Sequence, residues 1–445
     1  MFLKKIIPKS FLNIRHLFFA WYGAWKYNHP SDQLIVIGIT GTSGKSSTVF
    51  FLRQCLEAVG YKVGSLSTID FYINGQEKLN NQKMTMLGKM QIQKYLREMV
   101  TAGCEIAIVE TTSEGAVQFR DRYLNFDYFI LTNLYPEHIE SHGSYANYVN
   151  AKLGIIKRAG LTKRKKLKNK LGSLISKVFF INGEVAEASE FLKLENYDSK
   201  VLFGQPAKLT VSDAVARTNY QITDLHSDAQ GITFQVSGVP YLAPMYGVHN
   251  AYNLTAAIAV LQELGVTKAE TQAAVAHCVN APGRNEFITE AEQKGFKVIV
   301  DYAFEPQAML ALYEVVKLLK PKKTIQVFGS TGGGRDVSRR FTVGELVGKN
   351  TDICIVTDED PYDDNPLDIM ADVAGAVRKA GKKDNANLFV IPKRRVAIAK
   401  ALSLASPGDL VLVTGKGSEQ AMVVAGGEKI PWDDRVVIRE ELAKL

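Results

Sequence analysis

The sequence contains little cysteine and no long apolar run. Four Cys occur among 445 residues, at positions 55, 104, 278 and 354, and none are close enough to form a CxxC pair. A disulfide scaffold is therefore excluded, and buried reduced thiols in a cytoplasmic protein are expected. No stretch of about 18 uninterrupted apolar residues occurs, so a membrane-spanning helix is not expected.

Low-complexity segments and a broad excess of charge are also missing. Apolar residues make up 46% and charged residues 22%, which excludes a largely disordered chain. The net charge is 54 − 46 = +8, and residues 155–170 alone hold eight Lys/Arg and no acid. The basic balance therefore does not indicate a nucleic-acid-binding face. We expect residues 155–170 to form a solvated loop or helix end, with attraction to an anionic lipid or substrate as the alternative.

The first 33 residues form a basic and aromatic segment. Pro8, Arg15 and His16 interrupt its apolar run and no small-residue cleavage site follows, so a signal peptide is not expected. A short amphipathic helix is predicted instead, which either packs on the protein or lies on a membrane surface through residues 1–30. Its large aromatic residues are Phe18, Phe19, Trp21 and Trp25.

Strands and helices alternate from residue 34. Buried parallel strands are predicted at 34–40, 105–110 and 128–134, and helices at 46–60 and 250–266. Residues 199–245 alternate like antiparallel strands and predict a β-rich flank. A second series begins near Pro282, with strands at 297–303, 324–330, 353–358, 388–392 and 409–415 and helices at 306–320, 339–349, 367–380 and 394–404. This pattern predicts an α/β protein with domains at 34–281 and 282–445 and ligands at the carboxyl ends of the strands.

A glycine-rich stretch, GITGTSGKS at 38–46, lies between the first predicted strand and helix. It ends in Gly-Lys-Ser, as does the G-x-x-x-x-G-K-[ST] phosphate loop of nucleoside-triphosphate-binding proteins. Glycines let backbone amides surround phosphate oxygens, and the following helix adds its positive end. Lys45 is expected to reach the β/γ-phosphates and the Ser46 hydroxyl to bind Mg²⁺. The loop alone does not distinguish a kinase, a motor, a switch GTPase or a ligase.

Ten motif-like sequence blocks follow one another along the chain. They are GTSGKS (41–46), VETTSEG (109–115), TNLYPEHIESHGSYANYVNAK (132–152), GVHNAYNLTAAIA (247–259), PGRNE (282–286), DYAFEP (301–306), FGSTGGGRDVSRR (328–340), DEDPYDDNP (358–366), GKGSE (415–419) and WDDR (432–435). In this order they resemble the Mur ligase family, and within it the muramoyl-tripeptide synthetase branch. The resemblance covers roughly residues 34–440.

The resemblance implies a central P-loop ATPase domain with a parallel sheet, followed by a Rossmann-like C-terminal domain. It implies a cytoplasmic enzyme of peptidoglycan precursor synthesis, expected to be a monomer without nucleic-acid partners. ATP would convert a carboxylate of UDP-MurNAc-L-Ala-D-Glu into an acyl phosphate, and the amine of an amino acid would then displace phosphate. Two alternatives stay open: a ligase of the same fold acting on a folate, polyamide or lipid-linked carboxylate, and a non-catalytic ATP-binding subunit.

The resemblance also assigns site residues. Catalysis is expected from Lys45, Glu110, His138 and Lys152. Two Mg²⁺ ions are expected, one bound by Ser46 and one by Glu110, His138 and Lys152. Lys152 is expected to be carbamylated, because an ammonium would repel the ion whereas an anionic oxygen would bind it. ATP contacts are expected from Gly41, Thr42, Ser43, Gly44, Lys45, Ser46, Ser47, Asn250, Asn253, Arg284 and Asp301. Contacts with the other substrates are expected from Thr85, Thr112, Ser113, Arg335, Asp336, Arg340, Glu359, Asp360, Tyr362, Gly415 and Glu419. For Asn250 and Asn253 the alternative is a helix N-cap.

The chain also departs from the branch pattern. Only 33 residues precede the first strand, so the N-terminal domain with which this branch grips the uridine diphosphate is not expected in this sequence. Three alternatives stay open: the substrate is held differently, it is supplied by a partner, or it is not the usual nucleotide. Tyr362 stands where the D-N-P-R motif for diaminopimelate has Arg, and five acids occur at 358–364. These changes favour a lysine-like acceptor, unless Arg335 or Arg395 substitutes or the segment is a solvated loop. Three family histidines are replaced, by Glu114, Phe304 and Ser418.

Overall fold

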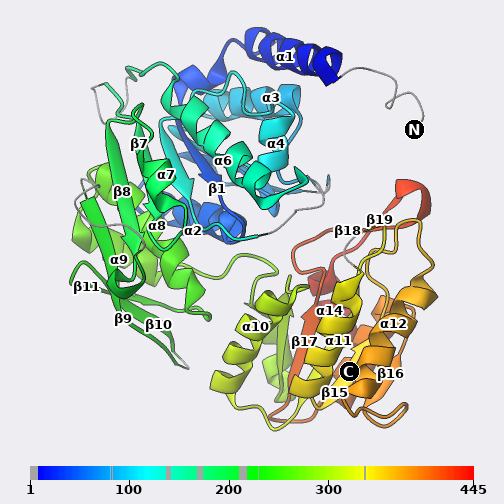
Figure 1. Cartoon of the computed structure of the whole chain (residues 1–445). Coiled ribbons are helices and arrows are strands. Elements are labelled where there is room, and N and C mark those ends of the chain that lie inside the picture. Colours follow the sequence, from blue (N-terminus) through cyan, green and yellow to red (C-terminus); the bar gives the residue numbers. More distant parts are fainter. Residues whose placement is uncertain are drawn as a thin grey trace. The chain divides into compact units, whose positions relative to one another are not determined.

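The computed structural model describes residues 9–80, 82, 84–136, 142–167, 174–209, 218–228, 230–334 and 337–445. The chain divides into an N-terminal unit (residues 1–80, 84–226 and 230–279) and a C-terminal unit (residues 81–83, 227–229 and 280–445). Figure 1 colours the first unit from blue to green and the second from yellow-green to red. None of the helices in the described ranges has the length and hydropathy that crossing a bilayer requires.

The N-terminal unit is built on one eleven-stranded sheet with β1 (Ile35–Thr40) near its middle. Strand β1 runs parallel to β5 (Ile106–Glu110) on one side and to β6 (Tyr128–Leu131) on the other. The sheet order is β11 (Val239–Ala243), β10 (Gly231–Val236), β9 (Thr218–Asp228), β8 (Ser199–Gly204), β7 (Val178–Asn182), β6, β1, β5, β2 (Val63–Leu66), β3 (Asp70–Ile73) and β4 (Gln76–Leu79). Since β1 has a parallel neighbour on each side, ligands are expected where its carboxyl end meets theirs.

The prediction of antiparallel strands across 199–245 is partly wrong. Strand β8 runs parallel to both β7 and β9, whereas β10 and β11 pair antiparallel. In β9, buried Tyr220 and Ile222 alternate with half-exposed residues. The alternation of buried and exposed residues therefore indicates that one face of this strand is partly solvated. Such a face is commoner in antiparallel sheets, but a parallel strand can have one too.

Helices position the loops of this sheet. Helices α2 (Lys45–Ala58), α8 (His249–Glu263) and α9 (Lys268–Ala276) pack against one another. Helix α6 (Tyr145–Gly160) contacts α4 (Ser113–Val117), and α1 (Lys9–Lys26) lies along α3 (Lys89–Thr101), as Figure 1 shows. The short helix α7 (Ala188–Leu192) follows β7. The N-terminal helix is thus confirmed and packs on the protein.

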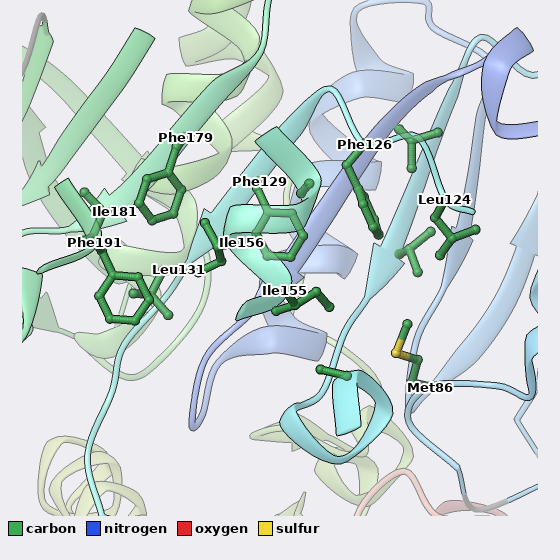
Figure 2. Packing of buried hydrophobic residues seen from close by; sticks show 14 of the residues in the cluster. Met86, Leu124, Phe126, Phe129, Leu131, Ile155, Ile156, Phe179, Ile181 and Phe191 are labelled. Carbon is green, nitrogen blue, oxygen red and sulfur yellow. The ribbon is translucent and has the colours of Figure 1, made fainter. Parts of the chain in front are cut away.

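A dry apolar core holds α6 against the sheet. Phe129 of β6 and Phe179 of β7 meet Ile155 and Ile156 of α6 in a cluster that continues to Phe191 of α7 (Figure 2). All five side chains are at most 1% exposed. Burying each of these side chains stabilises the fold by about 1.5–3 kcal/mol. Together they strongly favour this position of α6 on the sheet.

The basic segment is less solvated than its composition suggests. Lys165 is buried, and its Nζ donates to the backbone oxygens of Ser31 (2.7 Å), Leu34 (2.8 Å) and Asn125 (2.6 Å) and to Asp127 Oδ2 (2.6 Å). Burial lowers the pKa of Lys165, and the Asp127 carboxylate opposes that shift. The expectation of a solvated segment is therefore wrong at Lys165, because carbonyl groups and a buried carboxylate around the start of β1 take up its ammonium.

The C-terminal unit is a doubly wound α/β layer, as predicted. Its sheet order is β12 (Glu286–Phe287), β13 (Lys297–Asp301), β17 (Leu410–Thr414), β14 (Thr324–Phe328), β15 (Ile353–Val356) and β16 (Leu388–Val390), parallel except for β12. One core includes α10 (Pro306–Leu319), α11 (Ser338–Asn350) and α12 (Pro366–Lys379), and a second includes α13 (Arg394–Leu404) and α14 (Asp434–Leu442). A separate hairpin joins β18 (Ala421–Val423) and β19 (Lys429–Pro431).

Candidate active site

The phosphate loop lies between β1 and α2 and begins at Gly41. The expected start of the loop at Gly38 is wrong, because Gly38 lies in β1 and pairs with Val109 of β5. Gly41 has φ +155°, and a Cβ there would collide with Thr132 Oγ1. Gly44 has φ +75°, and a Cβ would lie 2.6 Å from Asn253 Oδ1. Both positions therefore require glycine for the loop to keep its close approach to neighbouring segments.

Asn133 holds the loop in place, a role that the sequence analysis missed. Its Oδ1 accepts hydrogen bonds from the amides of Thr42 (3.0 Å) and Ser43 (2.8 Å), and its Nδ2 donates to Ser43 O (3.1 Å). Helix α2 then begins at Lys45 with no side-chain cap. The positive end of α2 and the loop amides together suit an anionic phosphate.

Lys45 and Ser46 stand at the first turn of α2, followed by half-buried Ser47. Lys45 Nζ donates to the carbonyls of Gly41 (3.0 Å) and Thr42 (2.8 Å), so the lysine folds back over the loop. Ser46 Oγ lies 3.0 Å and 2.9 Å from the two carboxylate oxygens of Glu110. The Lys45 cation thus lies against the loop and the Ser46 hydroxyl against Glu110. Their contacts with phosphate and Mg²⁺ stay predictions.

Glu110 ends β5 beside the phosphate loop and is 1% exposed. Besides Ser46, its Oε2 accepts from Thr68 N (2.7 Å) and lies 3.0 Å from Thr68 Oγ1. Thr68 Oγ1 is also 3.1 Å from Thr85 Oγ1. One carboxylate and three hydroxyls therefore follow one another from α2 to Thr85. Such hard oxygen donors fit Mg²⁺, although no group of three or more His, Cys, Asp or Glu is gathered among the described residues.

Lys152 reaches the same loop from α6 and is 1% exposed. Its Nζ donates to Gly41 O (2.8 Å) and Thr40 Oγ1 (3.4 Å) and lies 4.7 Å from the centre of the Tyr148 ring. Tyr148 OH is in turn 3.0 Å from Thr42 Oγ1. Lys152 is thus a buried amine at the loop, which is where carbamylation would place an anionic oxygen donor.

The described histidine at this site is His142, because His138 lies outside the described residues. His142 Nε2 is 3.0 Å from Ser113 Oγ, and its ring meets Tyr148 edge-on at 5.4 Å. Burial and then the Lys152 cation lower the pKa of His142, while Glu114 opposes them. Thr112 Oγ1 accepts from Gly115 N (3.0 Å) as the N-cap of α4. His142 belongs to the 132–152 block, but the sequence assigned it no role.

Asn250 and Asn253 line the other side of the loop. Asn253 Oδ1 lies 3.2 Å from Thr48 Oγ1 on α2, and its Nδ2 donates to Asn250 Oδ1 (3.2 Å). Asn250 Nδ2 donates to Tyr246 O (2.9 Å). The N-cap alternative is wrong, because α8 begins at His249 after Val248 and has no side-chain cap. Asn253 instead joins α8 to α2 through Thr48, and Asn250 accepts a hydrogen bond from Asn253.

In the C-terminal unit, Asp301 orders a turn at the end of β13. Its carboxylate accepts from the amides of Asn285 (2.6 Å) and Ala303 (2.7 Å). Burial raises the pKa of Asp301 and the Arg284 cation opposes this shift. The Arg284 guanidinium lies 4.2 Å from the centre of the Tyr302 ring. Arg284 and Asp301 are therefore neighbours, as their positions in two sequence blocks suggested.

An internal lysine partly neutralises the expected acceptor-binding acids. Lys416 Nζ donates to Asp360 Oδ1 (2.9 Å) and Glu419 Oε2 (2.6 Å), and Tyr302 OH donates to Glu419 Oε1 (3.3 Å). Gly415 has φ +101°, and a Cβ there would collide with the Glu359 carboxylate. The acids of 358–364 are thus not simply a solvated loop, since Glu359 and Asp360 are each 3% exposed.

Two arginines considered for the acceptor site each pair with two carboxylates. Arg340 pairs with Asp372 (3.0 Å) and Asp364 (3.1 Å). Arg395, considered as a substitute for the motif arginine, pairs with Glu440 and Glu441. Arg335 and Asp336 lie outside the described residues. Tyr362 adopts φ +53°, and its ring borders Gly333.

We expect Glu359→Gln to raise stability at pH 8 by on the order of 2–3 kcal/mol and to have little effect at pH 4. Burial raises the pKa of Glu359 from 4.5 to about 7, and its Oε2 has no hydrogen-bond partner among the described residues. Because the folded protein binds this proton more tightly than the unfolded chain, stability is lost as pH rises from about 4.5 to about 7. Thermal unfolding of both proteins across this range measures the effect. Exposed Glu428→Gln is the control, and equal pH curves for wild type and Glu359→Gln would contradict the expectation.

Two family models match the chain: the Mur ligase middle domain over residues 39–261 and the Mur ligase glutamate ligase domain over residues 283–417. UDP-N-acetylmuramyl-tripeptide synthetases of Roseiflexus sp. (strain RS-1) and Borreliella afzelii (strain PKo) are 31% and 32% identical to it. These alignments cover 99% and 94% of this chain and 83% and 79% of the relatives. A solved UDP-N-acetylmuramoyl-L-alanyl-D-glutamate–2,6-diaminopimelate ligase is 25% identical with a TM-score of 0.58, over 93% of this chain and 79% of that one. The resemblance is confirmed: the chain belongs to the Mur ligase family of ATP-dependent amide ligases.

Proposed function

We propose that this ligase adds an amino acid to UDP-MurNAc-L-Ala-D-Glu. The observation that carries the proposal is the meeting of Ser46, Glu110 and Lys152 around one phosphate loop. The names and coverage of the tripeptide-synthetase relatives support the choice of carboxylate substrate. The domain boundaries 34–281 and 282–445 are part of the same proposal.

Different residues of the site are proposed to bind the nucleotide and the metal ions. The amides of residues 41–47 and the Lys45 ammonium hold the β- and γ-phosphates, and Asn250 and Asn253 border the nucleotide. Ser46 would hold one Mg²⁺, and Glu110, carbamylated Lys152 and His138 the other. When bound, such ions would supply positive charge to the phosphate and acyl oxygens.

The chemistry is two substitutions. A carboxylate oxygen of the D-Glu residue attacks the γ-phosphorus, the bond to ADP breaks, and an acyl phosphate forms. The neutral amine of the acceptor then attacks the acyl carbon, loses a proton, and expels inorganic phosphate as the amide forms. ATP is required because a carboxylate is a poor electrophile.

For the acceptor we propose a lysine-like amino acid. Tyr362 cannot form the two-pronged ion pair that a motif arginine would make with a second carboxylate. Glu359, Asp360 and Glu419 surround Lys416, and this cluster suits a cationic side-chain end better than an anionic one. Arg340 and Arg395 are each paired with two carboxylates, which supports the proposal that neither of these two replaces the motif arginine.

We expect phosphate release from ATP, Mg²⁺ and UDP-MurNAc-L-Ala-D-Glu when lysine or ornithine is supplied, with a tripeptide identified by mass spectrometry. meso-Diaminopimelate is the matched competitor, since it differs from lysine by the second carboxylate. A product with meso-diaminopimelate alone would overturn the acceptor proposal and leave the ligase proposal intact. No product with any amine would overturn the proposed carboxylate substrate and favour a folate, polyamide or lipid-linked one.

A further inference from the structure

Helix α1 carries a continuous row of exposed aromatic side chains. Trp25 is 61% exposed, Phe18 52% and Trp21 45%, with Ile14 at 65% at the N-terminal end of the row. The Phe18 ring stacks on Tyr22 at 6.1 Å, and Tyr22 lies 5.8 Å from Trp25. Large aromatic residues are costly to leave in water, so a row of them on one helix face indicates a surface that contacts something apolar.

The opposite face of α1 is already used by the protein. Ala20 and Ala24 are at most 1% exposed, and α1 packs on α3, beside which it lies in Figure 1. Just after α1, Arg97 of α3 donates to the backbone oxygens of Tyr27 (2.9 Å) and Asn28 (2.9 Å). Because α1 packs on the protein through Ala20 and Ala24, turning the aromatic row inward would break these packing contacts.

The charge of this segment distinguishes between possible partners. Residues 1–31 contain Lys4, Lys5, Lys9, Arg15 and Lys26 and no Asp or Glu. Arg15 precedes Phe18 by three residues and Lys26 follows Tyr22 by four, so both exposed cations border the aromatic row. Two copies of this segment brought together would oppose five cations with five cations. An anionic lipid surface instead offers phosphate for the cations and an interfacial layer for Trp, Tyr and Phe.

We infer that α1 binds the protein to the surface of anionic phospholipid membranes, with its aromatic row in the interfacial layer and its cations at the headgroups. The helix lies on the membrane and does not span it. This inference is independent of the ligase substrate and goes beyond the proposed function.

The test uses the full chain with vesicles of phosphatidylcholine alone or mixed with phosphatidylglycerol. Two of the three Trp residues lie in α1, so their emission reports insertion directly. We expect co-sedimentation roughly tenfold stronger with the anionic vesicles, a blue shift of Trp emission, and weakening of both by high salt. No sedimentation and no shift with anionic vesicles would overturn the inference.

Variants assign the binding to α1. The triple change Phe18→Ser, Trp21→Ser and Trp25→Ser is expected to lower vesicle binding at least about tenfold without changing the circular dichroism, because the side chains point into solvent. Phe341→Ser on α11 is the matched control, being 44% exposed. A triple variant that still binds would overturn the inference. Self-association of wild type that the triple change abolishes, without vesicle binding, would assign the face to a second copy and also overturn it.

Discussion

Lys152→Ala is expected to lower kcat by roughly 10²–10³-fold while leaving ATP affinity within about threefold of wild type. Lys152 Nζ touches Gly41 O from α6, on a loop whose Ser46 bonds Glu110. Once carbamylated, it would supply an anionic oxygen for the metal that neutralises charge during acyl-phosphate formation. The phosphate contacts of Lys45 and the loop amides would persist, so binding and turnover should separate. Steady-state phosphate release and nucleotide titration measure the two quantities.

Rescue separates a carbamate from a purely structural amine. Short-chain carboxylic acids should restore part of the activity of Lys152→Ala, because a small carboxylate can fill the space left by the carbamate. In wild type, ¹³C-labelled bicarbonate should give a carbamate resonance that Lys152→Ala lacks. Exposed Lys157→Ala on the same helix is the control and should keep full activity. Full turnover by Lys152→Ala would rule out its catalytic role.

The phosphate loop was predicted from its glycine-rich motif, and Glu110 from the family resemblance. The sequence did not predict that strands 34–40 and 105–110 are neighbours; the structure shows it in the parallel pairing of β1 with β5. Sequence reasoning could not find Asn133 or His142, because their value lies in which atoms they reach: the amides of Thr42 and Ser43, and Ser113 Oγ. Sequence spacing predicts that a residue lies at the carboxyl end of a strand. It does not predict which atoms of other segments that residue contacts.

Charge patterning did not predict how the acids at 358–364 pair inside the protein. Asp360 bonds Lys416, and Glu359 lies against Gly415. Composition gives the sign of a segment's net charge but does not show which residues its charges pair with. Here the counter-charge of Asp360 is Lys416, more than fifty residues away in the sequence. Lys165 is the same case in the N-terminal unit, where one cation of a basic run turns inward.

That inward turn leads to the largest stability effect that we expect: Asp127→Ala should destabilise the N-terminal unit by about 3–5 kcal/mol. Asp127 Oδ2 accepts from Lys165 Nζ (2.6 Å) and Val36 N (2.8 Å), and its Oδ1 is 3.6 Å from Lys177 Nζ. All three charged side chains are at most 2% exposed. Removing the carboxylate would leave two buried cations without their counter-ion, and burial already lowers the pKa of Lys177 to about 8.

Chemical denaturation of the variant at pH 7 measures this loss, with the exposed Asp198–Arg164 pair as the matched control. Asp198 and Arg164 are 35% and 44% exposed, so breaking their ion pair should cost at most about 1 kcal/mol. Asp127→Ala should recover stability as pH rises past 8, because the buried lysines then lose their protons at less cost. Since the carboxylate compensates both cations, adding Lys165→Met to Asp127→Ala should also restore part of the loss. A loss no larger than that of the control, or one that no pH relieves, would mean that packing around β1 and not charge compensation holds this end of the sheet.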